Sequence, residues 1–258
     1  MLEQTELGGL HVRRGGSGPP LLYVHGLGES GLCFERLIAD PRLDGLTHLC
    51  PDLPGYGKSP WCAEPLTLAA QAERIAAWLE AVGVGPVVVL GHSMGGVIGL
   101  MLCERRPDLV RGLLDVEGNV SLDDCGYSSL AAADERRAFL EGGFAALLER
   151  FFDAGARDPV VRDYFVSVRI CDPRAYHLNS VELVELSGGE ELARRRAALA
   201  LPLLYLLGDP RGTGARSRAM LDEAGVPWRP IPDAGHWPFR DQQALFVGEL
   251  LRFLGVLR

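Results

Sequence analysis

A run of apolar residues that turns directly into a helix is the strongest constraint in this sequence. Residues 85–93, GPVVVLGHS, lack alternating polar positions, which predicts a strand buried on both faces of a parallel sheet. Residues 94–107, MGGVIGLMLCERRP, are predicted as a helix. Ser93 lies at the turn between them, where Gly91 and Gly95 leave room for the chain to close. Such a turn strains the serine and exposes its hydroxyl at the end of the sheet.

The rest of the chain alternates apolar runs with helix-like stretches. Further strands are predicted at 19–26, the start of 46–59, 110–118, 201–209 and 226–236, with helices at 66–84 and 241–257. Between 119 and 198 the strands stop, and helices are predicted at 134–155 and 158–170. The Gly-rich segment 15–18 is predicted as a hairpin turn between N-terminal strands.

This order predicts an α/β fold with a mostly parallel, doubly wound sheet. Residues 1–118 and 199–258 form the predicted core domain, and residues 119–198 form a helical cap inserted into it. Ligands bind at the carboxyl ends of the strands in such sheets. We therefore expect the functional site where the strands end and the cap begins.

Composition narrows the class of protein and of partner. The 258 residues are 47% hydrophobic and 23% charged, which suits one large globular domain. The net charge of −8 disfavours nucleic acids and anionic membranes as partners, because both attract basic surfaces. Neither the six cysteines nor the histidines show metal-site spacing, so we expect no metal and no cofactor. Without a secretory signal or a run of 18 apolar residues, we expect a cytoplasmic protein.

Four motifs together resemble those of the α/β-hydrolase fold, over nearly the whole chain. They are HGLG (25–28), DLPGYGKS (52–59), GHSMGG (91–96) and DAGHWPF (233–239). The resemblance implies a capped serine hydrolase in which Ser93 is the nucleophile. It also implies that the backbone N–H groups of Leu27 and Met94 form the oxyanion hole. The motifs also contain the expected supporting residues His25, Gly26, Gly91, His92 and Gly95.

His236 is the predicted general base. It follows a strand, lies in a loop after Gly235, and comes after every candidate acid, as in the hydrolase order of serine, acid and histidine. It would take the proton of Ser93 and later activate water. The other histidines of the chain are His11, His25, His48, His92 and His177.

The acid that orients this histidine departs from the commonest family pattern. Most members carry an aspartate three residues after the glycine that follows the next strand, but here Arg211 stands three residues after Gly208. A subset, including many haloalkane dehalogenases, places the acid at the end of the preceding strand, where VRGLLDVEG presents Glu117. We predict Glu117 as the acid and keep Asp209 as the alternative. Asp115 lies deeper in the strand and is expected to bind backbone N–H groups or an arginine.

The predicted cap carries many aromatic residues, which favours an apolar pocket and a small hydrophobic substrate. The leading hypothesis is a serine hydrolase that cleaves a carboxylic ester, thioester or related acyl bond through a covalent acyl-enzyme. Alternatives are a cofactor-free lyase, C–C hydrolase or acyltransferase with the same triad. A further alternative is a non-catalytic small-molecule receptor with a vestigial triad. Fold and motifs do not identify the substrate or the oligomeric state.

Overall fold

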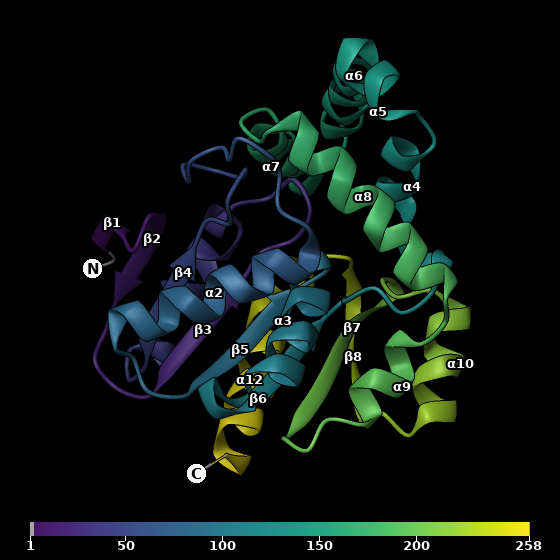
Figure 1. Cartoon of the computed structure of the whole chain (residues 1–258). Coiled ribbons are helices and arrows are strands. Elements are labelled where there is room, and N and C mark those ends of the chain that lie inside the picture. Colours follow the sequence, from purple (N-terminus) through teal and green to yellow (C-terminus); the bar gives the residue numbers. More distant parts are fainter. Residues whose placement is uncertain (1–2, 258) are drawn as a thin grey trace.

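An eight-stranded sheet runs through the molecule (Figure 1). The computed structural model describes residues 3–257, and within them the strand order is β1-β2-β4-β3-β5-β6-β7-β8. β2 pairs antiparallel with β1 and β4, and the remaining pairs are parallel. The strands are β1 (Glu3–Leu7), β2 (Leu10–Gly15), β3 (Pro20–Val24), β4 (Thr47–Pro51), β5 (Val87–His92), β6 (Val110–Val116), β7 (Leu203–Arg211) and β8 (Trp228–Gly235).

Helices cover both faces of this sheet. α2 and α3 lie on one face and α12 on the other (Figure 1). The α-helices are α1 (Glu35–Ile38), α2 (Leu68–Val82), α3 (Met94–Arg105), α4 (Gly126–Ala132), α5 (Arg136–Ala138), α6 (Phe144–Gly155), α7 (Pro159–Val168), α8 (Pro173–Gly188), α9 (Leu192–Ala197), α10 (Ala215–Ala224), α11 (Pro238–Asp241) and α12 (Gln243–Val256). The predicted doubly wound, mostly parallel α/β fold is confirmed.

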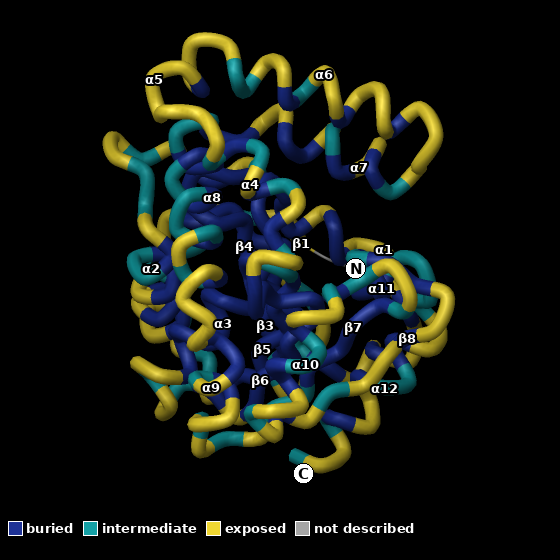
Figure 2. Tube along the Cα trace, turned by 90° about the vertical axis from the view of Figure 1, so that its right-hand side faces the viewer, coloured by how far each residue is buried: buried dark blue, intermediate teal, exposed yellow. Residues whose placement is uncertain are grey.

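Burial explains why the central strands lack polar alternation. Every residue of β5 is buried, as is every residue of β6 except Arg111, and these strands form the dark core in Figure 2. Such strands are stable only where helices cover both faces. The apolar runs of the sequence therefore predicted their position in the sheet as well as their type.

The N-terminal hairpin differs from the prediction. β1 and β2 join through Gly8 and Gly9, which have φ angles of 57° and 76°, rather than through residues 15–18. The segment 15–18 leads from β2 to β3, and these two strands are not neighbours because β4 lies between them. The prediction missed β1 because Glu3–Leu7 is polar and mostly exposed, so it shows no apolar run.

Five helices, α4 to α8, extend beyond the carboxyl ends of the strands, and we refer to them as the cap (Figure 1). The helix predicted at 134–155 is divided, because a π-helical turn at Phe139–Gly143 separates α5 from α6. α9 belongs to the predicted cap segment but packs on α3 and α10 of the core instead. The domain bounds at residues 118 and 199 stay a prediction.

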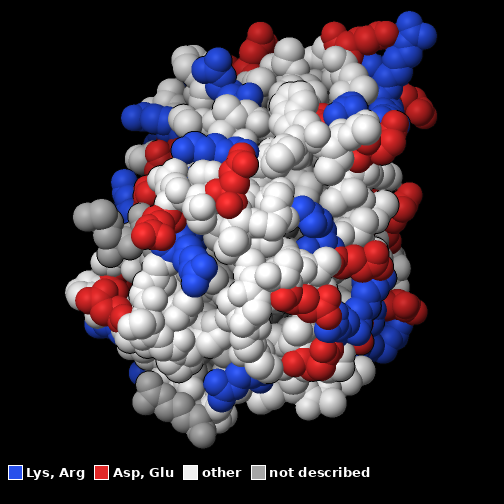
Figure 3. Space-filling view, turned by 60° about the vertical axis from the view of Figure 1, so that its left-hand side comes forward, with Lys and Arg blue, Asp and Glu red and all other residues white. Residues whose placement is uncertain are grey.

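The surface carries both signs of charge. On the face shown in Figure 3, basic and acidic side chains are interspersed. Many charged side chains form exposed pairs, such as Arg106 with Glu80 and Arg216 with Glu190. Within residues 3–257, no helix combines the length and the apolar character that crossing a membrane requires.

Candidate active site

The turn between β5 and α3 holds Ser93 in a conformation that few residues adopt. Its φ is 53° and its ψ is −120°, and its backbone N–H donates to the carbonyl oxygen of Val116 at 2.9 Å. A Cβ atom on Gly95 would lie 2.0 Å from the carbonyl oxygen of Val24. A Cβ on Gly91 would lie 2.3 Å from that of Gly95. Only glycine fits these positions, so the turn can close and Ser93 stays half-exposed at the edge of the sheet.

Glu117 follows β6 directly and is buried. Its φ is 55°, which turns the chain away from the strand. One carboxylate oxygen, Oε1, accepts the backbone N–H groups of Gly208 at 2.5 Å and Thr213 at 3.1 Å. The other oxygen, Oε2, lies 3.2 Å from Nδ1 of His236. Two fixed donors therefore orient the carboxylate toward the imidazole.

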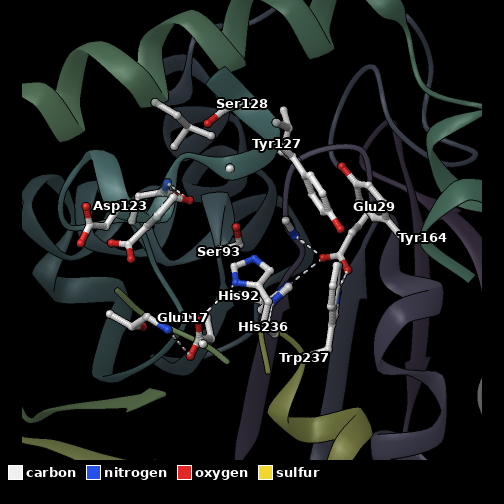
Figure 4. A pocket seen from close by; sticks show the side chains of 18 residues that line it. Glu29, His92, Ser93, Glu117, Asp123, Tyr127, Ser128, Tyr164, His236 and Trp237 are labelled. Carbon is white, nitrogen blue, oxygen red and sulfur yellow. Dashed lines mark hydrogen bonds and ion pairs between the residues drawn. The ribbon is translucent and has the colours of Figure 1, made fainter. Parts of the chain in front are cut away.

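His236 lies between Glu117 and Ser93 in the close view of the site (Figure 4). It is half-buried and follows the end of β8, while Ser93 follows β5 and Glu117 follows β6. The alternative acid, Asp209, is not part of this group. Its Oδ1 accepts from Nη1 of Arg218 at 2.7 Å, and its side chain is half-exposed.

His25 connects the HGLG segment to the 52–59 segment. Nε2 of His25 accepts the backbone N–H of Leu53 at 3.0 Å, so its proton resides on Nδ1 and bonds the carbonyl oxygen of Gly26 at 2.9 Å. Burial lowers the pKa of His25, which keeps the ring neutral. Leu27 lines the cavity beside Ser93, and Met94 is the buried first residue of α3.

Glu29 is a site residue that the sequence analysis missed. It is 3% exposed and accepts hydrogen bonds from the backbone N–H of Gly26, Nδ1 of His92 and Nε1 of Trp237. Burial alone raises the pKa of Glu29. The charge of His92 and the three hydrogen bonds outweigh burial and lower the pKa to about 2. The available signal was an acid immediately after the glycine turn of an apolar strand.

A cavity of about 210 Å³ joins these residues beneath the cap. The cap contributes Tyr127, Ser128, Tyr164 and Leu183, and the core contributes Trp237 beside His236. Tyr127 stacks on Tyr164 with ring centroids 5.2 Å apart. The acidic residues that line the cavity are Glu29, Glu117, Asp123 and Asp124, and its described lining includes no lysine or arginine.

Other predicted cap aromatics pack within the cap. Phe139 stacks on Tyr176, and Phe151 contacts Tyr127 edge to face. Phe152 is exposed on the outside of α6. The cap therefore uses a minority of its aromatic side chains to line the cavity.

Asp115 has the arginine partner that the sequence analysis expected. Nε of Arg196 donates to Oδ2 of Asp115 at 2.7 Å, and both side chains are fully buried. This pair joins β6 to α9 and explains why α9 packs on the core. Asp124 has a structural contact as well, because it accepts the backbone N–H of Val120 at 2.8 Å. Across residues 3–257, no cluster of three or more His, Cys, Asp or Glu side chains is arranged to hold a metal ion.

Fold and site together define a class of protein. A parallel sheet, a strained serine between strand and helix, and a carboxylate–histidine pair under a helical cap form one arrangement. The family model described as the alpha/beta hydrolase family matches residues 21–249. The chain belongs to this family, and the resemblance seen in its four motifs is confirmed.

Individual relatives resemble the chain to different extents. Lipase LipV of Mycobacterium tuberculosis is 44% identical over 116 residues, which make up 44% of this chain. The match spans 43% of LipV, which is less than half of its length. The 2-succinyl-6-hydroxy-2,4-cyclohexadiene-1-carboxylate synthase of Serratia proteamaculans is 27% identical over 92% of this chain and 93% of its own length. A crystal structure of a mutant of the N-acyl homoserine lactonase AidH superposes with a TM-score of 0.78 at 24% identity. It covers 98% of this chain and 96% of AidH, and at this identity it shows the shared fold.

Proposed function

We propose that the protein is a serine hydrolase that cleaves the acyl bond of a small, uncharged carboxylic ester or thioester. The observation that carries this proposal is the Glu117–His236 hydrogen bond directly beside the strained Ser93 in one cavity. A receptor needs no orienting carboxylate on a histidine, whereas a general base does. Relatives named as a lipase and a lactonase support acyl chemistry.

The proposed reaction begins when Oγ of Ser93 attacks the carbonyl carbon of the ester. His236 takes the hydroxyl proton on Nε2, and Glu117 stabilises the imidazolium through Nδ1. The tetrahedral oxyanion accepts hydrogen bonds from the N–H groups of Leu27 and Met94. Collapse breaks the bond to the leaving group, which receives the proton from His236 and leaves an acyl ester on Ser93.

Water completes the proposed cycle. His236 removes a proton from a water molecule, the resulting hydroxide attacks the acyl carbon, and the carboxylic acid leaves as Ser93 recovers its proton. Each step uses side chains and backbone groups of this chain. In the proposal, Gly26, Gly91, Gly95, His25 and His92 support the geometry without touching the reacting atoms.

The cavity supports the proposed substrate class. Its volume of about 210 Å³ suits a short acyl chain or a small ring, and Tyr127, Tyr164 and Trp237 provide apolar surface. The described lining carries four carboxylates and no lysine or arginine, and the charge of His92 offsets only that of Glu29, so an anionic substrate would be repelled. We therefore propose neutral esters in preference to those with a free carboxylate.

An active-site-directed fluorophosphonate probe tests the proposed nucleophile. We expect labelling of the folded wild type and none of Ser93→Ala. Ser128→Ala is the matched control, because Ser128 lines the same cavity, and it should still be labelled. A folded wild type that takes up no label would favour the receptor alternative.

Substrate class is tested separately with p-nitrophenyl esters from acetate to decanoate. We expect the highest kcat/KM at short chain lengths because of the small cavity. Labelling of Ser93 without turnover of any of these esters would favour lyase, C–C hydrolase or acyltransferase chemistry on the same residues.

A further inference from the structure

Glu29 connects three segments that are far apart in the sequence. Its Oε2 accepts the N–H of Gly26 and Nδ1 of His92, each at 2.8 Å. Its Oε1 accepts Nε1 of Trp237 at 2.7 Å, across 208 residues of sequence. The carboxylate therefore lies where the 25–30 loop, the end of β5 and the segment 236–237 between β8 and α11 meet (Figure 4).

His92 carries this connection further. Its Nδ1 faces the carboxylate of Glu29, and its Nε2 lies 2.8 Å from the carbonyl oxygen of His236. Both partners are acceptors, so both ring nitrogens must carry a proton, and the side chain is an imidazolium. His92 is 1% exposed, and its ring centroid lies 4.9 Å from that of His236.

The Glu29–His92 pair connects the segment that holds Leu27, the proposed oxyanion donor, to the segment that holds His236, the proposed base. The N–H of Gly26 bonds Glu29, and the next residue is Leu27, the proposed oxyanion donor. At the other end, the carbonyl oxygen of His236 belongs to the proposed base itself. These loops follow β3 and β8, which are four places apart in the sheet, so sheet pairing alone does not hold them together.

We propose that Glu29 and His92 are positioning residues whose buried ion pair connects the 25–30 loop to the segment 236–237 between β8 and α11. This inference rests on the proposed hydrolase function. By fixing one peptide beside the oxyanion donor and the backbone of the base, the pair holds both at the distance that attack by Ser93 requires. Neither side chain takes or gives a proton during the reaction.

The surroundings of the pair define its dependence on pH. Burial alone lowers the pKa of His92, but the charge and hydrogen bond of Glu29 outweigh it and raise the pKa above its usual value. Glu29 therefore favours the doubly protonated form of His92. The other titratable groups that face the pair are His236, Glu117, Asp115, Cys33 and Tyr164.

The protonation of His92 is tested directly by NMR of the histidine ring nitrogens. In the wild type at pH 7 we expect the ¹⁵N shifts of an imidazolium for His92, assigned by their loss in His92→Gln. In Glu29→Gln the remaining signal should be that of a neutral ring. A neutral His92 in the wild type at pH 7 would overturn the proposal. This measurement needs no substrate, so it stands even if the ester hydrolase function fails.

The positioning role is tested by kinetics on the same variants. Glu29→Gln keeps the shape of the side chain but replaces one carboxylate oxygen with an amide N–H₂ group. This group is itself a donor, so it cannot accept the hydrogen bond that the oxygen accepted. We expect kcat and the rate of fluorophosphonate labelling to fall about 10- to 100-fold, with KM little changed. Glu29→Asp should recover part of the loss, because it restores the charge.

Two further variants complete the experiment. Glu35→Gln removes an exposed carboxylate six residues away and should match the wild type. His92→Gln should lose about as much as Glu29→Gln, and the double variant little more than either, because one pair is removed in each case. If Glu29→Gln does not fold, His92→Gln supplies the kinetic measurement. A folded variant of either residue with kcat within twofold of the wild type would overturn the positioning role.

Discussion

Two acidic residues near the end of the sheet differ in what surrounds them. Glu117 is buried, has two backbone donors on one oxygen and has His236 on the other. Gly212 is required beside it, since a Cβ there would lie 2.1 Å from Oε1. Asp209 is half-exposed and neutralised by Arg218. Burial and fixed donors hold a carboxylate in one orientation, whereas an exposed ion pair contributes little to geometry or stability.

Substitution of the two acids should separate them clearly. We expect Glu117→Gln to lower kcat about 10⁴-fold, because the amide no longer stabilises the imidazolium or fixes its tautomer. Asp209→Asn should remain close to the wild type. The measurement is kcat on the best p-nitrophenyl ester, with circular dichroism to verify folding. A large loss in Asp209→Asn with a nearly normal Glu117→Gln would refute the assignment of Glu117.

The β5–α3 unit shows how steric fit specifies a local structure. Gly95 is the second residue of α3, and the backbone of β3 passes directly over it. The close approach lets the helix begin at the end of the strand and brings its N-terminal N–H groups near Ser93. Glycine destabilises most helices, but here any side chain would separate α3 from the sheet.

Two glycine-to-alanine substitutions in helices should therefore have opposite effects. Gly95→Ala places its Cβ 2.0 Å from a carbonyl oxygen, and we expect it to lower the free energy of unfolding by at least about 3 kcal/mol. Gly248→Ala in α12 meets no atom within 4 Å and should raise that free energy by about 0.5–1 kcal/mol. Urea denaturation of both variants measures the difference. Equal changes in the unfolding free energy of the two variants would show that the turn between β5 and α3 tolerates a side chain at residue 95.

The molecule as a whole depends on buried ion pairs that cross between its parts. Asp115 and Arg196 join the central sheet to the first core helix after the cap. Glu29 follows β3 and His92 ends the neighbouring strand β5, and their hydrogen bonds to Trp237 and His236 connect this pair to the segment after the distant strand β8. Buried pairs lose solvation and add little net stability over apolar contacts, but loss of one partner leaves an unpaired charge. Their main effect is to specify which segments meet.

The Glu29–His92 pair should give the molecule a defined pH window of stability. The pKa of Glu29 falls from 4.5 to about 2 on folding, so its contribution is present above pH 4.5 and is lost as the pH falls toward 2. The pKa of His92 is raised above 6.5, so its contribution is present below pH 6.5 and is lost as the pH rises through the folded value.

The difference in unfolding free energy between wild type and Glu29→Gln should thus be largest between pH 4.5 and 6.5. Between pH 5.5 and pH 3, the wild type should lose about 2 kcal/mol more of its unfolding free energy than the variant, because the pKa of Glu29 is 4.5 in the unfolded chain and about 2 in the folded protein. Urea unfolding of both proteins at pH 3, 5.5 and 8 measures this. Parallel curves across the three pH values would contradict the ion pair.

Local sequence patterns were sufficient for strands β3 to β8 and for the turn between β5 and α3 that holds Ser93. The apolar run at 85–93 and the glycines around Ser93 express constraints that act over a few residues, so they are visible without a structure. Such patterns failed where an element is polar and at the edge, as in β1. They also failed at α9, whose packing depends on a partner in β6.

Contacts between distant residues were decided by the tertiary structure. Glu117 and His236 are 119 residues apart, and nothing in either local sequence shows that the carboxylate reaches Nδ1. Asp209 pairs with Arg218, nine residues along the chain, and its half-exposed side chain is not bonded to His236. Glu29 shows no special pattern beyond its position after a turn, yet it meets His92 and Trp237 in the core. Residue types and spacing determine which chemistry is available, but a hydrogen bond forms only where folding brings donor and acceptor within about 3 Å.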